Sequence, residues 1–241
     1  MATDLIELWA RSTKVAVLTG AGMSTDSGIP DFRGPNGLWT KDPNAAAMFD
    51  IQTYIDDPQV RRRAWEGRRN HPAWKARPNP GHQALTALQR HGRLGAIVTQ
   101  NIDGLHQSAG SQQVLELHGT IWEIECLDCG DRTPTAEVIA REEADPRCPR
   151  CGGILKTATV SFGQRLDQAV LDAAIKAAIE ADLLVAIGTS LQVMPAAGLA
   201  DMAQHLAIVN ADPTLYDEQA DVVVHEPIGA VLPSVARSLA T

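Results

Sequence analysis

The sequence predicts an α/β fold, a Rossmann-like doubly wound parallel sheet with a smaller inserted lobe. Short apolar runs without alternation recur along the chain and end abruptly in small or polar residues, as strands covered on both faces do. Stretches of helical length separate these runs, an alternation that is typical of parallel sheets. Two segments of different composition, 31–78 and 121–158, interrupt the alternation, and we interpret them as the inserted lobe.

Five strands and four helices are expected. The strands are residues 15–18, 96–98, 183–187, 206–209 and 222–224, and the helices are residues 82–91, 167–181, 195–204 and 229–240. Asp167 is expected to cap its helix, and Pro195 and Pro233 to lie in early helical turns. The larger domain then comprises residues 1–30, 79–120 and 159–241, and the small lobe comprises residues 31–78 and 121–158.

Composition and charge exclude several classes of protein. The formal net charge of −8 argues against general nucleic-acid binding. The longest strongly apolar run, residues 183–187, is far too short to span a membrane, and residues 1–12 lack the basic-then-apolar pattern of a signal peptide. Four cysteines in 241 residues do not make a disulfide scaffold. We therefore expect a cytoplasmic protein without nucleic-acid or membrane partners.

Polar or glycine-rich residues follow four of the expected strands. They are residues 19–22, 100–103, 188–190 and 210–212. Open α/β sheets bind ligands beyond the carboxyl ends of their strands, so these four strand ends are expected to form one binding crevice.

The four cysteines form two Cys-x-x-Cys pairs, Cys126 with Cys129 and Cys148 with Cys151, separated by eighteen residues. Paired thiolates on two tight turns supply four soft ligands in a tetrahedron, the donor set of structural zinc. Two redox-active dithiols are the alternative. Because four protein ligands leave no position for water, we expect one zinc ion that holds together a lobe with little core of its own.

The glycine-rich turn after the first strand, residues 20–25, is weak evidence on its own. Glycine permits a tight turn and a close approach to a pyrophosphate, but Thr25 stands where the dinucleotide-binding fingerprint has glycine. A plain glycine turn explains it equally well. The continuation, residues 27–34, carries Phe32 and Arg33, which indicates a flap over a bound nucleotide.

His118 follows an apolar stretch, residues 114–117, and directly precedes the cysteine module. A single histidine is more often a surface or core residue than a catalyst, although a place at the junction of two lobes favours a functional role. Asn101 and Asp103 are also open to two interpretations, because Asn-x-Asp-Gly is good turn chemistry.

Taken together, these strings resemble the sirtuins, the NAD-dependent protein-lysine deacylases, of the bacterial type. The matching strings are GAGMSTDSGIPDFRG at 20–34, TQNIDGLH at 99–106, LHGT at 117–120, the paired Cys-x-x-Cys module, VSFGQ at 160–164, GTSLQVMPAA at 188–197 and VNADPT at 209–214. They occur in the expected order between about residues 10 and 235, so the resemblance covers nearly the whole chain.

The resemblance implies roles for individual residues. His118 matches the general base, and Asn101 its polar helper at the reacting ribose. The residues that match NAD contacts are Gly20, Ala21, Thr25, Phe32, Arg33, Gln100, Ile102, Asp103, Gly188, Thr189, Ser190, Asn210 and Ile228. An acetylated protein or peptide is expected to bind as an extended strand at Val160, Phe162, Gly163 and Val193.

The implied reaction removes acetyl groups from protein lysine side chains and yields nicotinamide, free lysine and O-acetyl-ADP-ribose. A histidine with a pKa near neutrality suits the proton transfer from a ribose hydroxyl that this reaction requires. Mono-ADP-ribosyl transfer and the removal of longer or acidic acyl groups are alternative activities. A non-catalytic NAD sensor is another alternative, against which the presence of His118, Asn101 and Asp103 argues.

The choice of acyl group depends on Trp65 and Arg68. Some bacterial sirtuins bind the carboxylate of an acidic acyl group through a Tyr-x-x-Arg motif, and the corresponding segment here begins with Trp65. An indole donates one hydrogen bond but differs from a phenol in shape, so we expect acetyl to be preferred over succinyl. The arginines and tryptophans of residues 61–77 also fit nucleic-acid binding, but the net charge of −8 favours a solvated helical face.

Overall fold

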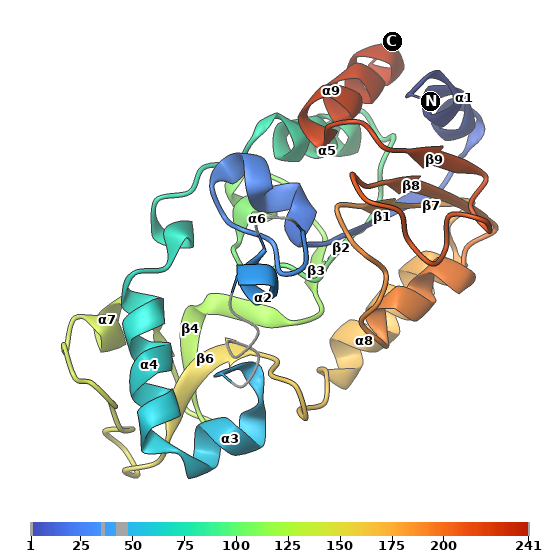
Figure 1. Ribbon diagram of the computed structural model, residues 1–241. Helices are drawn as coiled ribbons and strands as arrows, with labels where there is room; N and C mark the ends of the chain where they lie inside the picture. The colour runs from blue at the N-terminus through green and yellow to red at the C-terminus, as the bar shows by residue number, and fades with distance from the viewer. Residues whose placement is uncertain (1, 35–36, 42–47, 241) are drawn as a thin grey trace.

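The structure is a computed structural model that describes residues 2–34, 37–41 and 48–240 (Figure 1). Its central feature is a six-stranded sheet in the order β3-β2-β1-β7-β8-β9. The strands are β1 (Val15–Thr19), β2 (Ile97–Thr99), β3 (Val114–Glu116), β7 (Leu183–Ile187), β8 (His205–Val209) and β9 (Val222–Val224). All pairings between these neighbours are parallel, which confirms the predicted fold class.

The direction of winding reverses between β1 and β7. From β1 the chain proceeds outward to β2 and β3, and from β7 it proceeds outward on the other side to β8 and β9. Thr19 at the end of β1 pairs with Thr99 of β2 and with Ile187 of β7. Ligands of open α/β sheets bind beyond the carboxyl ends at such a switch point, so the topology puts the predicted crevice here.

Helices cover both faces of the sheet. On one face pack α1 (Ala2–Arg11), α5 (Pro80–Arg90) and α9 (Ile228–Leu239), and on the other pack α8 (Gln168–Ile179) and the 3₁₀-helix η4 (Ala196–Asp201) (Figure 1). In β1, Val15 and Val17 belong to the first core, whereas Ala16 and Leu18 belong to the second. Burial on both faces explains the unbroken apolar runs in the sequence. None of the described helices has the length and apolar character needed to cross a lipid bilayer.

Most of the predicted elements agree with the observed ones, but one helix differs in type and two elements were not expected. Asp167 caps α8 as expected, because its carboxylate accepts the N–H groups of Ala169 and Val170. The prediction of an α-helix at 195–204 is wrong, because the chain forms the shorter η4. Gly198 lies in its buried run of alanines and one leucine, and a glycine there lowers the stability of an α-helix. Pro233 lies in the second turn of α9, an early turn as expected. Both α1 and β3 are additional to the expected elements.

A second, smaller sheet is antiparallel and lies with short helices in the other part of the molecule. Its strands, in the order β5-β4-β6, are β4 (Gly119–Cys126), β5 (Arg132–Pro134) and β6 (Leu155–Thr159). The helices α3 (Ile51–Asp56), α4 (Pro58–Arg69) and α7 (Thr135–Ile139) surround this sheet (Figure 1). Trp65 of α4 packs with Ile124, Val138 and Leu155 in one core, so two segments distant in sequence meet. The domain boundaries stay a prediction, and both β4 and β6 run across them.

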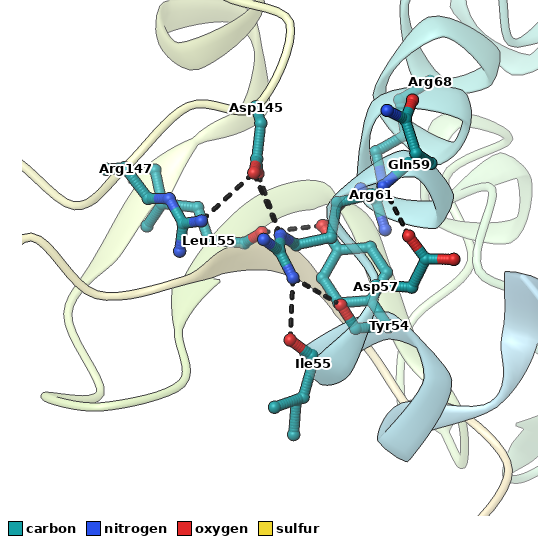
Figure 2. Close-up of polar contacts among 9 residues, drawn as sticks. All are labelled: Tyr54, Ile55, Asp57, Gln59, Arg61, Arg68, Asp145, Arg147 and Leu155. Carbon is teal, nitrogen blue, oxygen red and sulfur yellow. Dashed lines mark hydrogen bonds and ion pairs between the residues drawn. The ribbon is translucent and has the colours of Figure 1, made fainter.

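Arg61 joins α4 to the cysteine-bearing segment. Its guanidinium donates to the Asp145 carboxylate over 3.0 Å and to the backbone carbonyls of Tyr54 and Ile55 over 3.1 and 2.7 Å (Figure 2). The Arg61 side chain is only 4% exposed. The prediction of a solvated face for residues 61–77 is therefore wrong for Arg61, because this arginine is the buried partner of a carboxylate and two carbonyls.

Candidate functional site

The ends of β1 and β7 meet through glycine backbone. The N–H of Gly22 donates to the carbonyl of Gly188 over 2.9 Å. A Cβ atom on Gly20 would lie 2.7 Å from that carbonyl oxygen and from Cβ of Thr189, and Gly188 itself has φ +61°. The sequence predicts that these glycines permit close approach to a phosphate. The structure shows a second role: because they lack side chains, the backbones at the ends of β1 and β7 can touch.

The residues after Gly20 form the 3₁₀-helix η1 (Ala21–Ser27). Ala21 lies in its first turn, and Thr25 is exposed, with its hydroxyl donating to the Gly22 carbonyl over 3.0 Å. Ser24 of the same helix is fully buried and points to the end of β2.

Asn101 and Asp103 both bond to η1. The Asn101 amide donates to the Gly20 carbonyl over 3.0 Å and to the Ser24 hydroxyl over 3.1 Å. That hydroxyl donates in turn to the Asp103 carboxylate over 2.7 Å. Burial raises the pKa of Asp103, and the hydrogen bonds from Leu105 N–H and Ser24 oppose the rise. The strings that begin at residues 20 and 99 thus form one rigid polar unit, and Ser24 is a member that the sequence reasoning did not single out.

Gln100 connects β2 to β7 across the switch. Its amide donates to the Thr189 hydroxyl over 2.9 Å, and the same hydroxyl accepts the N–H of Leu191 over 3.2 Å. Leu191 has φ +51°, an unusual value for a branched residue, and is buried. Such local strain is concentrated at ligand sites.

His118 stands where β3 has ended and β4 begins. Its Nδ1 lies 3.0 Å from the carbonyl oxygen of Gln100. Because a carbonyl only accepts, Nδ1 carries the proton and Nε2 is free to accept one. Burial lowers the pKa of His118, partly offset by the hydrogen bond to Gln100. The geometry gives a half-buried, neutral imidazole of fixed orientation.

A buried polar chain behind the crevice was not predicted. His106 Nε2 lies 3.0 Å from the Thr19 hydroxyl, which donates to the Thr99 hydroxyl over 2.8 Å. Thr99 in turn accepts the N–H of Asn101 over 3.0 Å. The ring of His106 lies 4.8 Å from that of His82, and burial lowers the pKa of His106 to about 3 and of His82 to about 4. The sequence feature that could have indicated this polar chain is His106, the last residue of the TQNIDGLH string.

The predicted flap is an aromatic cluster. The ring of Phe32 lies 5.0 Å from that of Trp39, and the guanidinium of Arg33 lies 4.4 Å above the Trp39 ring. Trp39 also contacts Phe162, at 5.8 Å between ring centroids. The candidate cofactor loop and the candidate peptide segment therefore share one aromatic contact, and Trp39 is a further residue that the sequence reasoning missed.

Four remaining cofactor candidates lie around the same edge. Ser190 follows Thr189 and is half-buried, and the carbonyl of Ile102 accepts the N–H of Ile121 over 3.0 Å. Asn210 follows β8, which pairs with β7, and its amide donates to the Asp212 carbonyl over 2.7 Å. Ile228 begins α9, where a Cβ on the next residue, Gly229, would lie 2.9 Å from Asp26 of η1.

The candidate peptide segment leaves backbone groups available. The N–H of Val160 donates to the His118 carbonyl over 2.8 Å, and Phe162 pairs with residues 49 and 51 over 2.7 and 3.0 Å. The carbonyl of Val193 accepts the N–H of Ala197 over 2.9 Å. Within residues 2–34, 37–41 and 48–240, neither Gly163 nor the Val193 N–H makes a backbone hydrogen bond.

The four cysteine thiols are close enough together for a metal. All four sulfurs lie within 4.8 Å of one another, with Cys126 and Cys151 at 3.5 Å and Cys129 and Cys148 at 3.8 Å. A tetrahedron with zinc–sulfur bonds of about 2.3 Å has edges of about 3.8 Å, so the arrangement fits zinc. None of the four is in a disulfide.

Trp65 and Arg68 do not lie as the sequence interpretation assumed. Trp65 is fully buried in the core of the smaller sheet. Arg68 stacks on the rings of Trp65 and Tyr54, at 4.8 and 5.1 Å, and donates to the Tyr54 hydroxyl over 2.9 Å. That hydroxyl donates to the Leu155 carbonyl over 2.7 Å (Figure 2). A phenol is therefore present beside Arg68, but from α3, and its proton is already engaged.

Comparisons with known proteins agree on one family. The sequence model of the Sir2 family matches residues 20–195. The chain is 54% identical over 234 residues to NAD-dependent protein deacetylase 2 of Streptomyces coelicolor, covering 93% of this chain and 97% of that protein. It is 42% identical over 244 residues to NAD-dependent protein deacetylase 1 of Pyrobaculum aerophilum, covering 98% and 94%.

Solved structures give the same result. A Sir2 structure with a p53 peptide and NAD⁺ has a TM-score of 0.88 at 33% identity, covering 98% of both chains. Another, of a Sir2 variant with deacetylated p53 peptide and 3′-O-acetyl-ADP-ribose, has a TM-score of 0.89 at 34% identity, covering 98% of this chain and 96% of that one.

Proposed function

The chain belongs to the Sir2 family and removes acetyl groups from protein lysine side chains with NAD as co-substrate, and we propose that the crevice at the β1–β7 switch carries out this reaction. The observation that carries the proposal is the orientation of His118. Its Nδ1 is held by the Gln100 carbonyl at 3.0 Å, which leaves Nε2 as a base at the junction of the two sheets. A sensor that only binds NAD has no use for such a group.

The chain's own residues position the reactants. When bound, NAD supplies an electrophilic ribose carbon with nicotinamide as the leaving group. Asn101 holds η1 to the end of β2, and Asp103 presents a buried carboxylate toward the nicotinamide carboxamide. His118 Nε2 then takes the proton of a ribose hydroxyl, and the fixed imidazole needs no reorientation for that step.

The NAD-binding residues are those that the family resemblance indicates. The glycine contact between β1 and β7 provides a cradle without side chains, next to Ala21, Thr25, Ser190, Asn210 and Ile228. Phe32 and Arg33, which pack on Trp39, are the residues assigned to cover the bound nucleotide. The Thr189 hydroxyl already bonds to both Gln100 and Leu191. The residues proposed to hold the adenosine and nicotinamide ends of NAD are therefore joined to one another before NAD binds.

The acetylated peptide adds as an extended strand between Gly163 and Val193. The support is the pair of backbone positions with hydrogen-bonding groups unpaired among the described residues. Val160 is tied to His118 through the 2.8 Å backbone bond, so a peptide strand at this segment lies next to the base. Phe162, which is 47% exposed, provides an apolar surface for the aliphatic part of the lysine.

Zinc bound by Cys126, Cys129, Cys148 and Cys151 has a structural role in this proposal. Four thiolates close the coordination shell, so no water or substrate reaches the metal. Two of these cysteines share a core with Trp65 of α4, and the metal therefore also stabilises the helical part of the lobe. Because the thiols must stay reduced to bind zinc, we place the protein in the cytoplasm.

Product analysis tests the proposal. Incubation of the protein with an acetyl-lysine peptide and NAD, followed by mass spectrometry, is expected to yield O-acetyl-ADP-ribose and nicotinamide in equal amounts. ADP-ribosylated protein in place of O-acetyl-ADP-ribose would establish mono-ADP-ribosyl transfer instead. NAD binding without turnover would establish a sensor. His91→Ala, which changes an exposed histidine at the end of α5, serves as the control for His118→Ala.

A further inference from the structure

An open depression of about 350 Å³ lies beside the crevice. We name it the Trp122 pocket after its largest wall. Its lining residues are Gly104, Gln107, Ser108, Glu116, Thr120 and Trp122. The indole of Trp122 donates to the backbone carbonyl of Asp103 over 2.8 Å, whereas the Asp103 carboxylate faces Ser24 on the crevice side. The Asp103 residue therefore separates the two cavities.

The walls of the Trp122 pocket suit a positively charged group. Trp122 is 44% exposed, and its ring is held edge-on by Trp74 at 5.0 Å and 76°. An exposed indole face attracts cations, most strongly where water is partly excluded. The lining residues contain one carboxylate, amide and hydroxyl oxygens that accept hydrogen bonds, and no lysine or arginine.

Glu116 provides the charge. Its carboxyl is partly buried, and burial raises its pKa, with the neighbouring carboxylates of Asp103 and Glu123 adding to the rise and a hydrogen bond from Gln107 opposing it. In the part of the chain that the structure describes, no ion pair reaches Glu116, whereas Glu123 is paired with Arg132 at 3.0 Å. A carboxylate that no cationic side chain neutralises, next to an aromatic face, favours the binding of a positively charged group.

We propose that the Trp122 pocket binds an alkylammonium group, either a free amine or a lysine side chain of a docked protein. The ammonium lies over the Trp122 ring with its N–H groups on Glu116 and on the hydroxyls of Ser108 and Thr120. None of the residues that line this pocket is among the proposed NAD-binding or peptide-binding residues.

The binding is tested with n-butylammonium. The indole N–H resonance of Trp122 is assigned by its loss in Trp122→Phe. This resonance is expected to shift saturably with added butylammonium. The expected Kd is in the millimolar range, roughly the affinity that contacts with one carboxylate and one aromatic ring give. The uncharged 1-butanol is expected to have no such effect. Glu116→Gln is expected to weaken binding about tenfold. Glu218→Gln, the same change at an exposed residue that neither lines the pocket nor is among the charges acting on Glu116, is expected to leave binding unchanged.

Three results would overturn the proposal: no shift with butylammonium, an equal shift with 1-butanol, or equal weakening by Glu116→Gln and Glu218→Gln. The comparison of the two ligands uses the unaltered protein, so it decides even where Glu116→Gln does not fold. The source of the amine is identified by competition. Butylammonium that raises KM for an acetylated protein but not for a short acetyl-lysine peptide indicates a lysine of the docked protein, and equal effects on both substrates indicate a free amine.

Occupation of the pocket is also expected to change nicotinamide inhibition, because Trp122 holds the Asp103 carbonyl; this step rests on the proposed role of Asp103. The measurement is the inhibition constant of nicotinamide with and without saturating butylammonium, in the unaltered protein and in Glu116→Gln. A change of twofold or more only in the unaltered protein supports the coupling. Saturable binding with an unchanged inhibition constant refutes the coupling and leaves the pocket itself established.

Discussion

His118 is tuned by two opposing effects. Burial lowers its pKa, and the bond from Nδ1 to the Gln100 carbonyl stabilises the protonated form and raises it again. The lowering is the larger effect, so the imidazole stays neutral at pH values where an exposed histidine begins to take up a proton. At neutral pH His118 is therefore already in the unprotonated form that a general base requires.

The first prediction concerns the removal of this base. His118→Ala is expected to lower kcat by roughly 10²–10⁴-fold, the usual weight of general acid–base catalysis, with NAD affinity changed little. In the unaltered enzyme, activity is expected to fall only below pH 6.5, because the pKa of His118 is lowered from that value. Steady-state kinetics across pH 4.5–8 measures both effects. A folded, zinc-loaded His118→Ala enzyme within a few-fold of the His91→Ala control would show that His118 is not the base.

The second prediction concerns acyl choice. Acetyl-lysine is expected to exceed succinyl-lysine in kcat/KM by about ten- to a hundredfold, because the Tyr54 proton is engaged by Leu155 and Arg68 lacks a phenol that could bind the succinyl carboxylate with it. Trp65→Tyr is expected to leave this ratio unchanged and to lower the melting temperature, because Trp65 is fully buried. The two peptides are compared at equal concentration. Faster desuccinylation by the unaltered protein would refute the argument.

At the scale of elements, the smaller sheet depends on its metal. Cys126 is the last residue of β4, and Cys151 lies shortly before β6. Only a small core lies beneath these two strands. A core of this size does not keep the lobe folded unless a metal or another cross-link joins its segments.

The third prediction is therefore that Cys148→Ser, or a strong chelator, unfolds this lobe and abolishes activity while leaving His118 intact. Structural zinc in small modules contributes on the order of 10 kcal/mol, more than the stability of most domains. The measurements are zinc content and fluorescence of the buried Trp65. Active protein with less than half an equivalent of zinc would contradict the assignment.

The elements also indicate how far sequence reasoning reaches. The strands could be predicted because both of their faces are buried, which makes them unbroken apolar runs such as residues 183–187. η4 could not, because a buried run of four small residues and one leucine is compatible with both helix types and packing decides between them. Trp65 was placed in an acyl-binding motif by spacing alone, whereas its size and burial make it the core of the lobe. Trp122 bonds to a residue distant in sequence, so no local pattern could find it. For His106 the TQNIDGLH string gave the position but not the buried bond to Thr19.

At the scale of the whole molecule, the part of the chain that the structure describes contains two fully buried histidines, His82 and His106. Burial lowers their pKa values to about 4 and about 3, below the 6.5 of an exposed histidine. Below pH 6.5 the unfolded chain takes up protons that the folded chain rejects, so stability falls as the pH falls.

The fourth prediction follows. The free energy of unfolding is expected to decrease between pH 6.5 and about 4, and His82 alone accounts for up to about 3 kcal/mol of the loss. Urea unfolding at pH 7 and pH 4.5 measures it, in the unaltered protein and in His82→Gln. Loss of zinc at low pH affects both proteins alike, so their difference isolates the histidine. The same pH dependence in both would show that His82 does not contribute.

The strand order has a consequence for how the chain folds. β1 lies at the centre of the sheet, and its partner β7 is distant in sequence: Leu18 pairs with Ala186, 168 positions later. During synthesis, β1 therefore leaves the ribosome with both apolar faces and one edge uncovered, and its central pairing must wait until the chain has reached Ile187. The β4–β5 hairpin, by contrast, pairs residues about ten positions apart and forms as soon as it is made. The nascent chain thus assembles its metal-binding part first and its nucleotide-binding sheet last, and it is most exposed to aggregation in between.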